Sequence, residues 1–157
     1  MLIVGTDTLA DAQNGSFNTA TKVDNSNGKV YVQAVTNDAL TSNEVAMVLP
    51  AGSTYLATAP EVSVRAMIGF AAGAIASACV GWVQIRGQVS NCITAAGSIN
   101  GSLGHAISWG ATASAGLHCN SSSYQGLSQH VGYLTMASAT ATTQFDMFLV
   151  GKISTGL

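Results

Sequence analysis

Charge is the feature that this sequence most lacks. Charged residues make up 8% of its 157 residues, whereas an ordinary globular domain contains roughly 25%. Between Arg86 and Asp146 there is no Asp, Glu, Lys or Arg. Because a solvent-exposed helix normally carries charges on its outer face, this stretch favours strands and turns. It also indicates that other protein covers much of the surface.

Basic residues are too few and too dispersed to form a nucleic-acid-binding patch. The net charge is −2, and the five cations are Lys22, Lys29, Arg65, Arg86 and Lys152. Binding to phosphate backbones needs clustered Lys and Arg, so we expect no direct contact with nucleic acid. The first residues, Met1–Gly5, have neither the basic segment nor the long apolar run of a signal peptide. We therefore expect synthesis in the cytoplasm.

Cysteine is scarce, and its spacing matches no known framework. The sequence contains Cys79, Cys92 and Cys119, and their spacing resembles neither a disulfide scaffold nor a zinc site. We interpret them as small buried apolar residues made in a reducing cytosol. The alternative is a thiol nucleophile, which needs a nearby imidazole and a group that orients it. The three histidines are His105, His118 and His130, but no family signature surrounds any of the cysteines.

Other reactive arrangements are also missing. His118 and Cys119 are adjacent, so on a strand they point to opposite faces and would chelate one metal ion poorly. The seven Asp and Glu residues include no pair singled out as an acid and a base. The Gly-rich segment Gly97–Gly104 has no Lys and no helix pattern after it, both of which a phosphate-binding loop needs. We therefore expect a protein that is not an enzyme, with no catalytic residue, no cofactor and no metal.

The segment Val80–Gly87 organises the rest of the chain. Its alternation gives one small apolar side and one side with larger, polar-tipped residues, namely Trp82, Gln84 and Arg86. Trp and Arg are residue types that anchor protein interfaces, so these three are the candidate interface residues. The alternative is a core Trp with a polar rim.

Short alternating segments predict strands along most of the chain. Asn27-Gly28 suits a hairpin turn between strands at Thr19–Asp24 and Lys29–Val35, and Asn100-Gly101 is expected to form another turn. Further expected strands are Glu44–Leu49 (ended by Pro50), Glu61–Ala66, Met67–Ala71, Cys79–Arg86, Gln88–Thr94, His105–Trp109, Gly116–Cys119, Gln129–Met136 and Gln144–Val150. This pattern predicts an all-β fold, a compact antiparallel β-sandwich or barrel. We expect a single domain over residues 18–157 and an extended N-terminal arm over residues 1–17.

The apolar run Ala66–Val83 has a second interpretation. It is long enough to cross a bilayer, and Gly69 and Gly73 have the spacing of packed membrane helices. However, the run is mostly Ala and Gly, and its end carries the strand pattern described above. We therefore favour two strands joined by a bend at Ala72–Ala78, and we expect no membrane association.

Three groups of segments, in order, resemble the small decoration (cement) proteins of tailed-phage capsids. The segments are Asn27–Ala34, then Ile68–Ala71 with Gly81–Gly87, then Val131–Leu134 with Phe145–Val150. Together they span about residues 20 to 152. The sequence departs from the pattern at Met1–Phe17 and Ser114–Ser128.

The resemblance implies a structural virion protein without enzymatic activity. Decoration proteins are compact β-folds, often homotrimers, that bind the outside of the phage head at junctions between major capsid protein subunits and stabilise the shell. The partners it implies are therefore the major capsid protein and two further copies of this chain. The alternative is a phage tail or fibre component, or a carbohydrate-binding tip that uses Trp82, Tyr124 or Tyr133.

Overall fold

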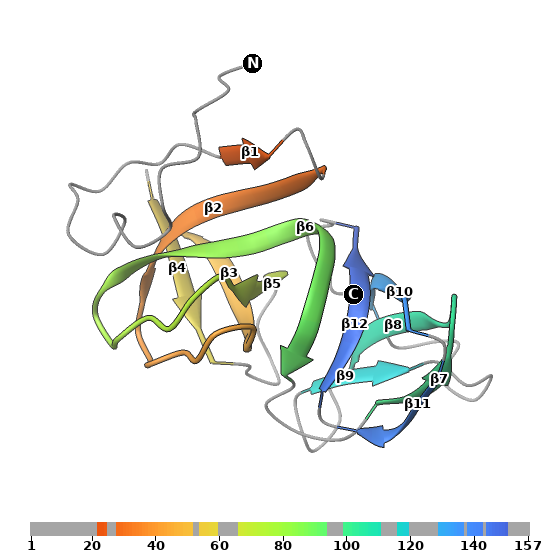
Figure 1. Cartoon of the computed structure of the whole chain (residues 1–157). Coiled ribbons are helices and arrows are strands. Elements are labelled where there is room, and N and C mark those ends of the chain that lie inside the picture. The colour runs from red at the N-terminus through yellow and green to blue at the C-terminus, as the bar shows by residue number, and fades with distance from the viewer. Residues whose placement is uncertain are drawn as a thin grey trace.

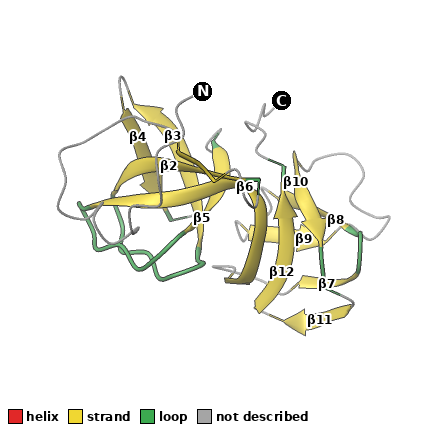
Figure 2. Ribbon diagram, turned by 45° about the horizontal axis from the view of Figure 1, so that its top comes forward, coloured by secondary structure: helices red, strands yellow, loops and turns green. Residues whose placement is uncertain are grey.

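The fold is all-β, as the sequence predicts. The computed structural model describes residues 22–24, 28–51, 54–59, 66–93, 99–110, 116–119, 129–136, 138–142 and 144–150. Within these ranges the chain forms twelve strands joined by turns and contains no helix (Figure 2). The expected arm at residues 1–17 lies outside the described residues.

The first half of the chain closes into a five-stranded barrel. Its strands run in the order β2-β4-β3-β5-β6, and β6 pairs again with β2 to close the ring. The bounds are β2 Lys29–Thr36, β3 Val45–Ala51, β4 Thr54–Thr58, β5 Met67–Ala71 and the first part of β6 Val80–Ile93. The short β1, Lys22–Asp24, adds to β2. The ladders are antiparallel as expected, except that β2 and β4 pair in parallel.

The second half of the chain forms an antiparallel sheet that grows from the same β6. Its order is β6-β12-β10-β8-β9, with β8 Ala106–Gly110, β9 Gly116–Cys119, β10 Gln129–Leu134 and β12 Gln144–Leu149. A separate ribbon pairs β7, Ile99–Ser102, with β11, Ser138–Thr142. Figure 1 shows β6 running along the barrel and then bending into the second sheet.

The bend in β6 is centred on Gly87. Before it, Val83 lies opposite Val32 of β2, and after it, Gln88 lies opposite Phe148 of β12. Gly87 has φ +94°, a conformation that costs other residues free energy because of their Cβ. A Cβ at this position would also lie 2.9 Å from the carbonyl oxygen of Gly28. The sequence predicts two strands separated at Gly87, whereas the glycine bends one continuous strand without ending it.

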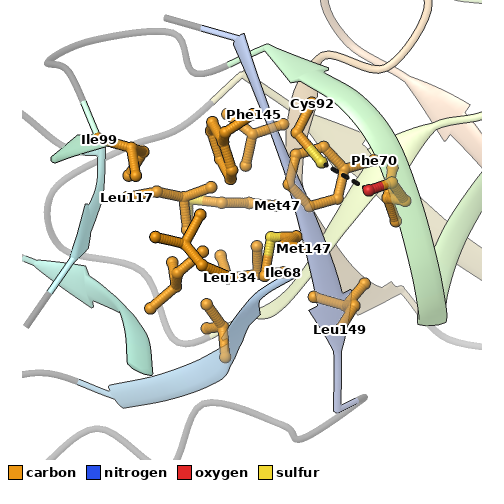
Figure 3. Packing of buried hydrophobic residues seen from close by; sticks show 14 of the residues in the cluster. Met47, Ile68, Phe70, Cys92, Ile99, Leu117, Leu134, Phe145, Met147 and Leu149 are labelled. Atoms are coloured by element: carbon orange, nitrogen blue, oxygen red, sulfur yellow. Dashed lines mark hydrogen bonds between the residues drawn. The ribbon is translucent and has the colours of Figure 1, made fainter. Parts of the chain in front are cut away.

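Two apolar cores result from this arrangement. The barrel interior is filled from β2, β3, β4, β5, β6 and the connecting turns, by Val32, Ala34, Leu40, Ala46, Val48, Ala57, Met67, Ala71, Ile75 and Val83. The outward side chains of β3 and β5, such as Met47 and Phe70, pack instead against the second sheet, with Phe145 and Met147 at the centre (Figure 3). A hydrogen bond attaches the end of β6 to the turn before β3: the N–H of Ile93 donates to the carbonyl oxygen of Asn43 at 2.7 Å.

The structure corrects several local expectations. Pro50 lies within β3, beyond Val48, where the ladder to β5 has already ended, so its missing N–H interrupts no bond on that side. Asn100-Gly101 lies within β7, and the positive φ of +81° that a turn needs occurs at Gly104. The strands β4 and β11 were not expected. β4 pairs with β3, which ends just before it at Ala51, whereas β11 pairs with the distant β7. Of the expected strand Glu61–Ala66, only Ala66 is described.

The run Ala66–Val83 forms β5, a bend and the start of β6, as the favoured interpretation predicts. Ile75 in the bend exchanges two backbone hydrogen bonds with Leu40, of 2.8 and 2.9 Å. In the described part of the chain, no helix has the length and apolar character that a membrane span requires.

Candidate functional site

The three predicted interface residues differ in exposure. Trp82 and Gln84 share one side of β6 and are only 6% and 5% exposed. The register with β2 shifts between Gln84 and Arg86, so the exposed Arg86 does not share that side. Trp82 lies opposite Gln33 of β2, which is also buried. The interface prediction for the set therefore depends on Arg86, the member that solvent reaches in this chain.

Gln84 has a structural contact at the bend of β6. Its Nε2 donates hydrogen bonds of 3.0 Å to the carbonyl oxygens of both Arg86 and Gln88. These two carbonyls flank Gly87, so the amide group of Gln84 links the backbone on the two sides of the bend. Gln84 thus supplies a donor to each of these two carbonyl oxygens. The bridge fixes the direction in which Arg86 and Gln88 leave the barrel.

An aromatic row crosses the second sheet next to this bend. Gln88 lies opposite Phe148, and Phe148 lies opposite Tyr133 of β10, so the three side chains share one face of neighbouring strands. Phe148 is 42% exposed and Tyr133 is 44% exposed, and Gln88 is exposed as well. We call Gln88, Phe148 and Tyr133 the β6–β12–β10 row. It presents an amide and two aromatic rings to solvent.

Close contacts within the sheet bring β10 against β12 and hold the ring of Tyr133. A Cβ at Gly132 would overlap the carbonyl oxygen of Phe148, so glycine allows β10 to approach β12 at this point. The rings of His130 and Tyr133 have centroids 4.5 Å apart at an interplanar angle of 64°, an edge-to-face contact that restrains Tyr133. The row therefore rests on a rigid part of the fold.

Asp146 shares the outer face of β12 with Phe148 and stabilises a bulge in β6. Its Oδ1 accepts a hydrogen bond of 2.7 Å from the backbone N–H of Asn91. Asn91 has φ +54°, and the register shifts between Phe145 and Met147, opposite this point. A bulge leaves backbone groups outside the ladder, and the carboxylate satisfies one of them.

Among the side chains that the structure describes, the cysteine and histidine candidates for catalysis do not form a recognisable centre. Cys92 is fully buried in the core beside the second sheet, and its Sγ lies 3.5 Å from the carbonyl oxygen of Val89 (Figure 3). Burial, aided by the charge of Asp146, raises the pKa of the Cys92 thiol well above its ordinary value, which makes it a poor nucleophile. Cys79 is half-buried and His105 is exposed. The side chains of His118 and Cys119 lie outside the described structure.

Metal ligands were searched for over the same described residues. No group of three or more His, Cys, Asp or Glu side chains there could hold a metal ion. Of the Gly-rich segment Gly97–Gly104, residues 99–104 are described, and they form β7 and the turn that follows it.

Sequence reasoning identified Arg86 as an interface candidate and Tyr133 in its alternative, but it missed Phe148 and Gln88. The signal for Phe148 was present, since it alternates with the apolar residues Phe145, Met147 and Leu149 along the expected strand Gln144–Val150, and all three are buried. A residue between two inward-facing neighbours on a strand must face outward. Gln88 was missed because its place beside Phe148 depends on a pairing between segments far apart in sequence.

Comparisons with known proteins find structural similarity and no sequence match. No family model and no curated protein matches the sequence. The chain is similar to the N base of the head fiber gp8.5 of bacteriophage phi29, with 9% sequence identity and a TM-score of 0.48. The alignment covers 80% of this chain and 97% of the phi29 chain. Similarity at this level assigns no function to the chain.

Proposed function

We propose that the chain is a structural protein of a tailed-phage head, a non-enzymatic decoration protein that binds the outside of the capsid. In this proposal it binds as a homotrimer at junctions between major capsid protein subunits and stabilises the shell. The protein has no direct contact with nucleic acid or membrane.

The observation that carries the proposal is where the resembling segments lie. The segment Asn27–Ala34 contributes β2, Ile68–Ala71 lies in β5, and Gly81–Gly87 lies in β6. These strands pair directly, as at Val32 with Val83 and at Phe70 with Gln84. The last two segments form β10 and β12, which continue the same ladder from β6. Segments far apart in sequence thus form one connected group of strands around β6.

The distribution of charge supports the same role. Three strands of the second sheet, β8, β9 and β10, lie wholly within the stretch between Arg86 and Asp146 that has no charged residue. Its outer face nevertheless exposes Phe148 and Tyr133. Stable assemblies bury extensive and rather apolar areas, and such a surface suits contact with another protein.

Stabilisation of a shell follows from binding linkage. A protein that binds the assembled capsid and not its separated subunits lowers the free energy of the assembled state. Each junction occupied adds a contribution, so modest contacts repeated over the shell give a large total. The contact resists expansion of the shell when packed DNA presses outward.

The test uses the phage whose genome encodes the chain. Particles made without this gene should release DNA at a lower temperature than wild-type particles, and added purified protein should restore the difference. Gold-labelled antibody should mark the head, and light scattering should give a trimer mass. A monomer that does not bind capsids would contradict the proposal, as would equal heat resistance of both particles.

A tail or fibre role, with a carbohydrate-binding surface, is the second candidate. The observation in its favour is the exposed pair of Tyr133 and Phe148, because aromatic rings on an open face can stack on sugars. Of the other residues named for this role, Trp82 is buried and Tyr124 lies outside the described residues. Antibody label on the tail, with none on the head, would favour this candidate.

A further inference from the structure

We propose that the outward face of the β2–β6 pair, centred on Trp82 and Gln33, is a docking surface and that its occupant is the first segment of the same chain, residues 1–21. This segment contains the expected arm at residues 1–17. The inference does not depend on the proposed function, because it concerns how the chain covers its own barrel. In this proposal the predicted interface residue Trp82 binds a segment of its own chain.

The direction of Trp82 follows from its two neighbours in β6. Val83 belongs to the barrel core, and a Cβ at Gly81 would overlap the side chain of Ile75, which belongs to the same core. Successive side chains of a strand point to opposite faces. Trp82 therefore points away from the barrel interior.

Gln33 points the same way from the neighbouring strand. It lies opposite Trp82 in the antiparallel ladder of β2 and β6, and its neighbours Val32 and Ala34 belong to the barrel core. Both outward side chains are nevertheless buried, since Trp82 is 6% exposed and Gln33 is 8% exposed. The outer wall of the barrel is thus covered at this point.

Neighbours within a sheet do not cover an aromatic side chain to this extent. Tyr133 and Phe148 lie opposite each other on paired strands, yet they remain 44% and 42% exposed. Trp82 is larger than either, and among the described residues it is the buried apolar side chain that belongs to neither apolar core. The cover of this face therefore comes from outside the two cores.

The first described residue lies next to this face. Lys22 begins β1 and lies opposite Tyr31 of β2. Because the two strands are antiparallel, the chain that precedes Lys22 approaches it from the direction of Gln33. A segment of 21 residues spans about 70 Å when fully extended, more than twice the length of the eight-residue β2. The segment 1–21 can therefore reach the whole face.

The composition of the first segment suits contact with an aromatic ring. It includes the apolar run Leu2–Val4 together with Leu9 and Phe17, and it contains no Lys, Arg or His. Apolar side chains that pack on Trp82 are removed from water, which favours the docked state. The segment thus brings the chemistry that the buried ring needs.

Other segments outside the described residues fit less well. Residues 60–65 connect β4 to β5, which flank β3 on the opposite side of the barrel from the β2–β6 pair. Residues 151–157 follow β12 near the bend, because Leu149 lies opposite Gly87, and they include the charged Lys152. This last segment is the alternative that the test includes.

The test measures the environment of Trp82 in the full-length chain. Trp109→Phe leaves Trp82 as the single tryptophan, and its emission maximum and its quenching by acrylamide report its access to solvent. One variant weakens the apolar contacts of the first segment, and a matched variant makes the same kind of change in the last segment. The substitutions are Ile3→Asp, Leu9→Asp and Phe17→Asp in the first segment, and Ile153→Asp and Leu157→Asp in the last.

We expect the first variant to shift the emission of Trp82 to longer wavelength and to raise its quenching constant severalfold, while the second variant behaves as the parent protein does. Circular dichroism should show β-structure in the parent and in both variants. If the second variant alone exposes Trp82, the occupant is the last segment. If neither variant exposes it, the first segment does not dock on this face.

A second measurement avoids destabilising substitutions. A nitroxide label, which quenches tryptophan fluorescence only at short range, is attached to the full-length chain in a background with Cys79→Ser and Cys119→Ser, where the remaining Cys92 is buried. The label positions are Thr6→Cys, Ser16→Cys and Thr19→Cys in the first segment, with Ser154→Cys as the control.

At least one label in the first segment should quench Trp82 more strongly than the control label does. The absence of such quenching at every position would overturn the proposal. If quenching occurs only when a labelled chain without tryptophan is refolded with an unlabelled chain, the segment comes from a second copy, and its assignment to the same chain is wrong.

Discussion

At the scale of single residues, Gly87 and Cys92 each have a structural role that few other residue types could fill. Gly87 combines a positive φ with a close approach to Gly28, so both its backbone and its missing side chain matter. Cys92 matters for the opposite reason, because its thiol fills space in a core that excludes water. Each leads to a measurable prediction.

A series of Gly→Ala variants separates backbone strain from steric overlap. Gly87→Ala should lower the free energy of unfolding by about 2 to 4 kcal/mol, because strain and the contact with Gly28 add together. Gly28→Ala, at φ +65° with open space around it, should cost about 1 to 2 kcal/mol from strain alone. Gly73→Ala, with neither feature, is the control and should be neutral or stabilise by up to about 1 kcal/mol. Denaturant unfolding measures all three, and equal losses for Gly87 and Gly73 would contradict this account.

The raised pKa of the Cys92 thiol predicts both its reactivity and a pH dependence. In a variant with Cys79→Ser and Cys119→Ser, Cys92 should not react with a thiol reagent at pH 8 unless the protein is denatured. The folded pKa lies above the ordinary value of 9.0, so the unfolded state loses its proton first as pH rises. Stability is therefore fully present below pH 9 and should fall above it, by up to about 1.4 kcal/mol per pH unit. Changing Cys92→Ala in the same background should remove this slope, and rapid labelling of the native protein would refute the prediction.

At the scale of elements, β6 is the strand on which both halves of the molecule depend. It pairs with β2 and β5 before Gly87 and with β12 after it. The bridge from Gln84 lies at the junction, so the two halves share this contact. A change at Gln84 should therefore affect more than one ladder.

Two matched Gln→Glu variants test the bridge. Gln84→Glu replaces a donor by an acid that faces the carbonyl oxygens of Arg86 and Gln88, and it should lower stability by about 3 kcal/mol. Gln88→Glu makes the same chemical change at an exposed position, and its effect should stay within about 0.5 kcal/mol. Thermal and denaturant unfolding give both values. Equal effects would show that the amide of Gln84 does not bridge the bend.

The elements that the sequence predicted well are those whose pattern is local. The expected strands Met67–Ala71 and Gly116–Cys119 match β5 and β9 residue for residue, and Lys29–Val35 matches β2 to within one residue. In contrast, β11 pairs with the distant β7, and β4 follows β3 after a Pro-Ala-Gly-Ser segment that predicts the end of a strand. Gly87 by itself predicts the end of a strand. However, β6 pairs with other strands on both sides of Gly87 and continues through it.

The candidate site was predicted only in part for the same reason. Alternation placed Trp82, Gln84 and Arg86 on one side of a strand, but the register with β2 shifts between Gln84 and Arg86, so Arg86 leaves the side that Trp82 and Gln84 share. Trp82 and Gln84 are buried and Arg86 is exposed, a difference that no periodicity encodes. The neighbours Gln88, Phe148 and Tyr133 meet only after three strands pair.

At the scale of the whole molecule, the two apolar cores share β6, and we expect them to unfold together in one cooperative transition. Trp82 reports on the barrel from β6, and Trp109 belongs to β8 of the second sheet. A Trp82→Phe variant and a Trp109→Phe variant each leave one reporter. The denaturant midpoints seen by fluorescence should coincide with those seen by far-ultraviolet circular dichroism in each variant, as two-state unfolding requires. Separate midpoints for the two reporters would show that the barrel and the second sheet unfold independently.

Because β6 pairs with strands on both sides of it in the sequence, its two parts find their partners at different times during synthesis on the ribosome. The part of β6 before Gly87 finds its partners in residues already synthesised, but the part that follows pairs with β12, at Gln144–Leu149. At roughly 5 to 20 residues per second, translation from Ile93 to Leu149 takes about 3 to 11 s. Throughout that interval Val89 and Cys92 lie on an unpaired strand edge, the kind of edge that recruits foreign strands. Nascent chains that stall in this interval should be the ones that aggregate or bind chaperones.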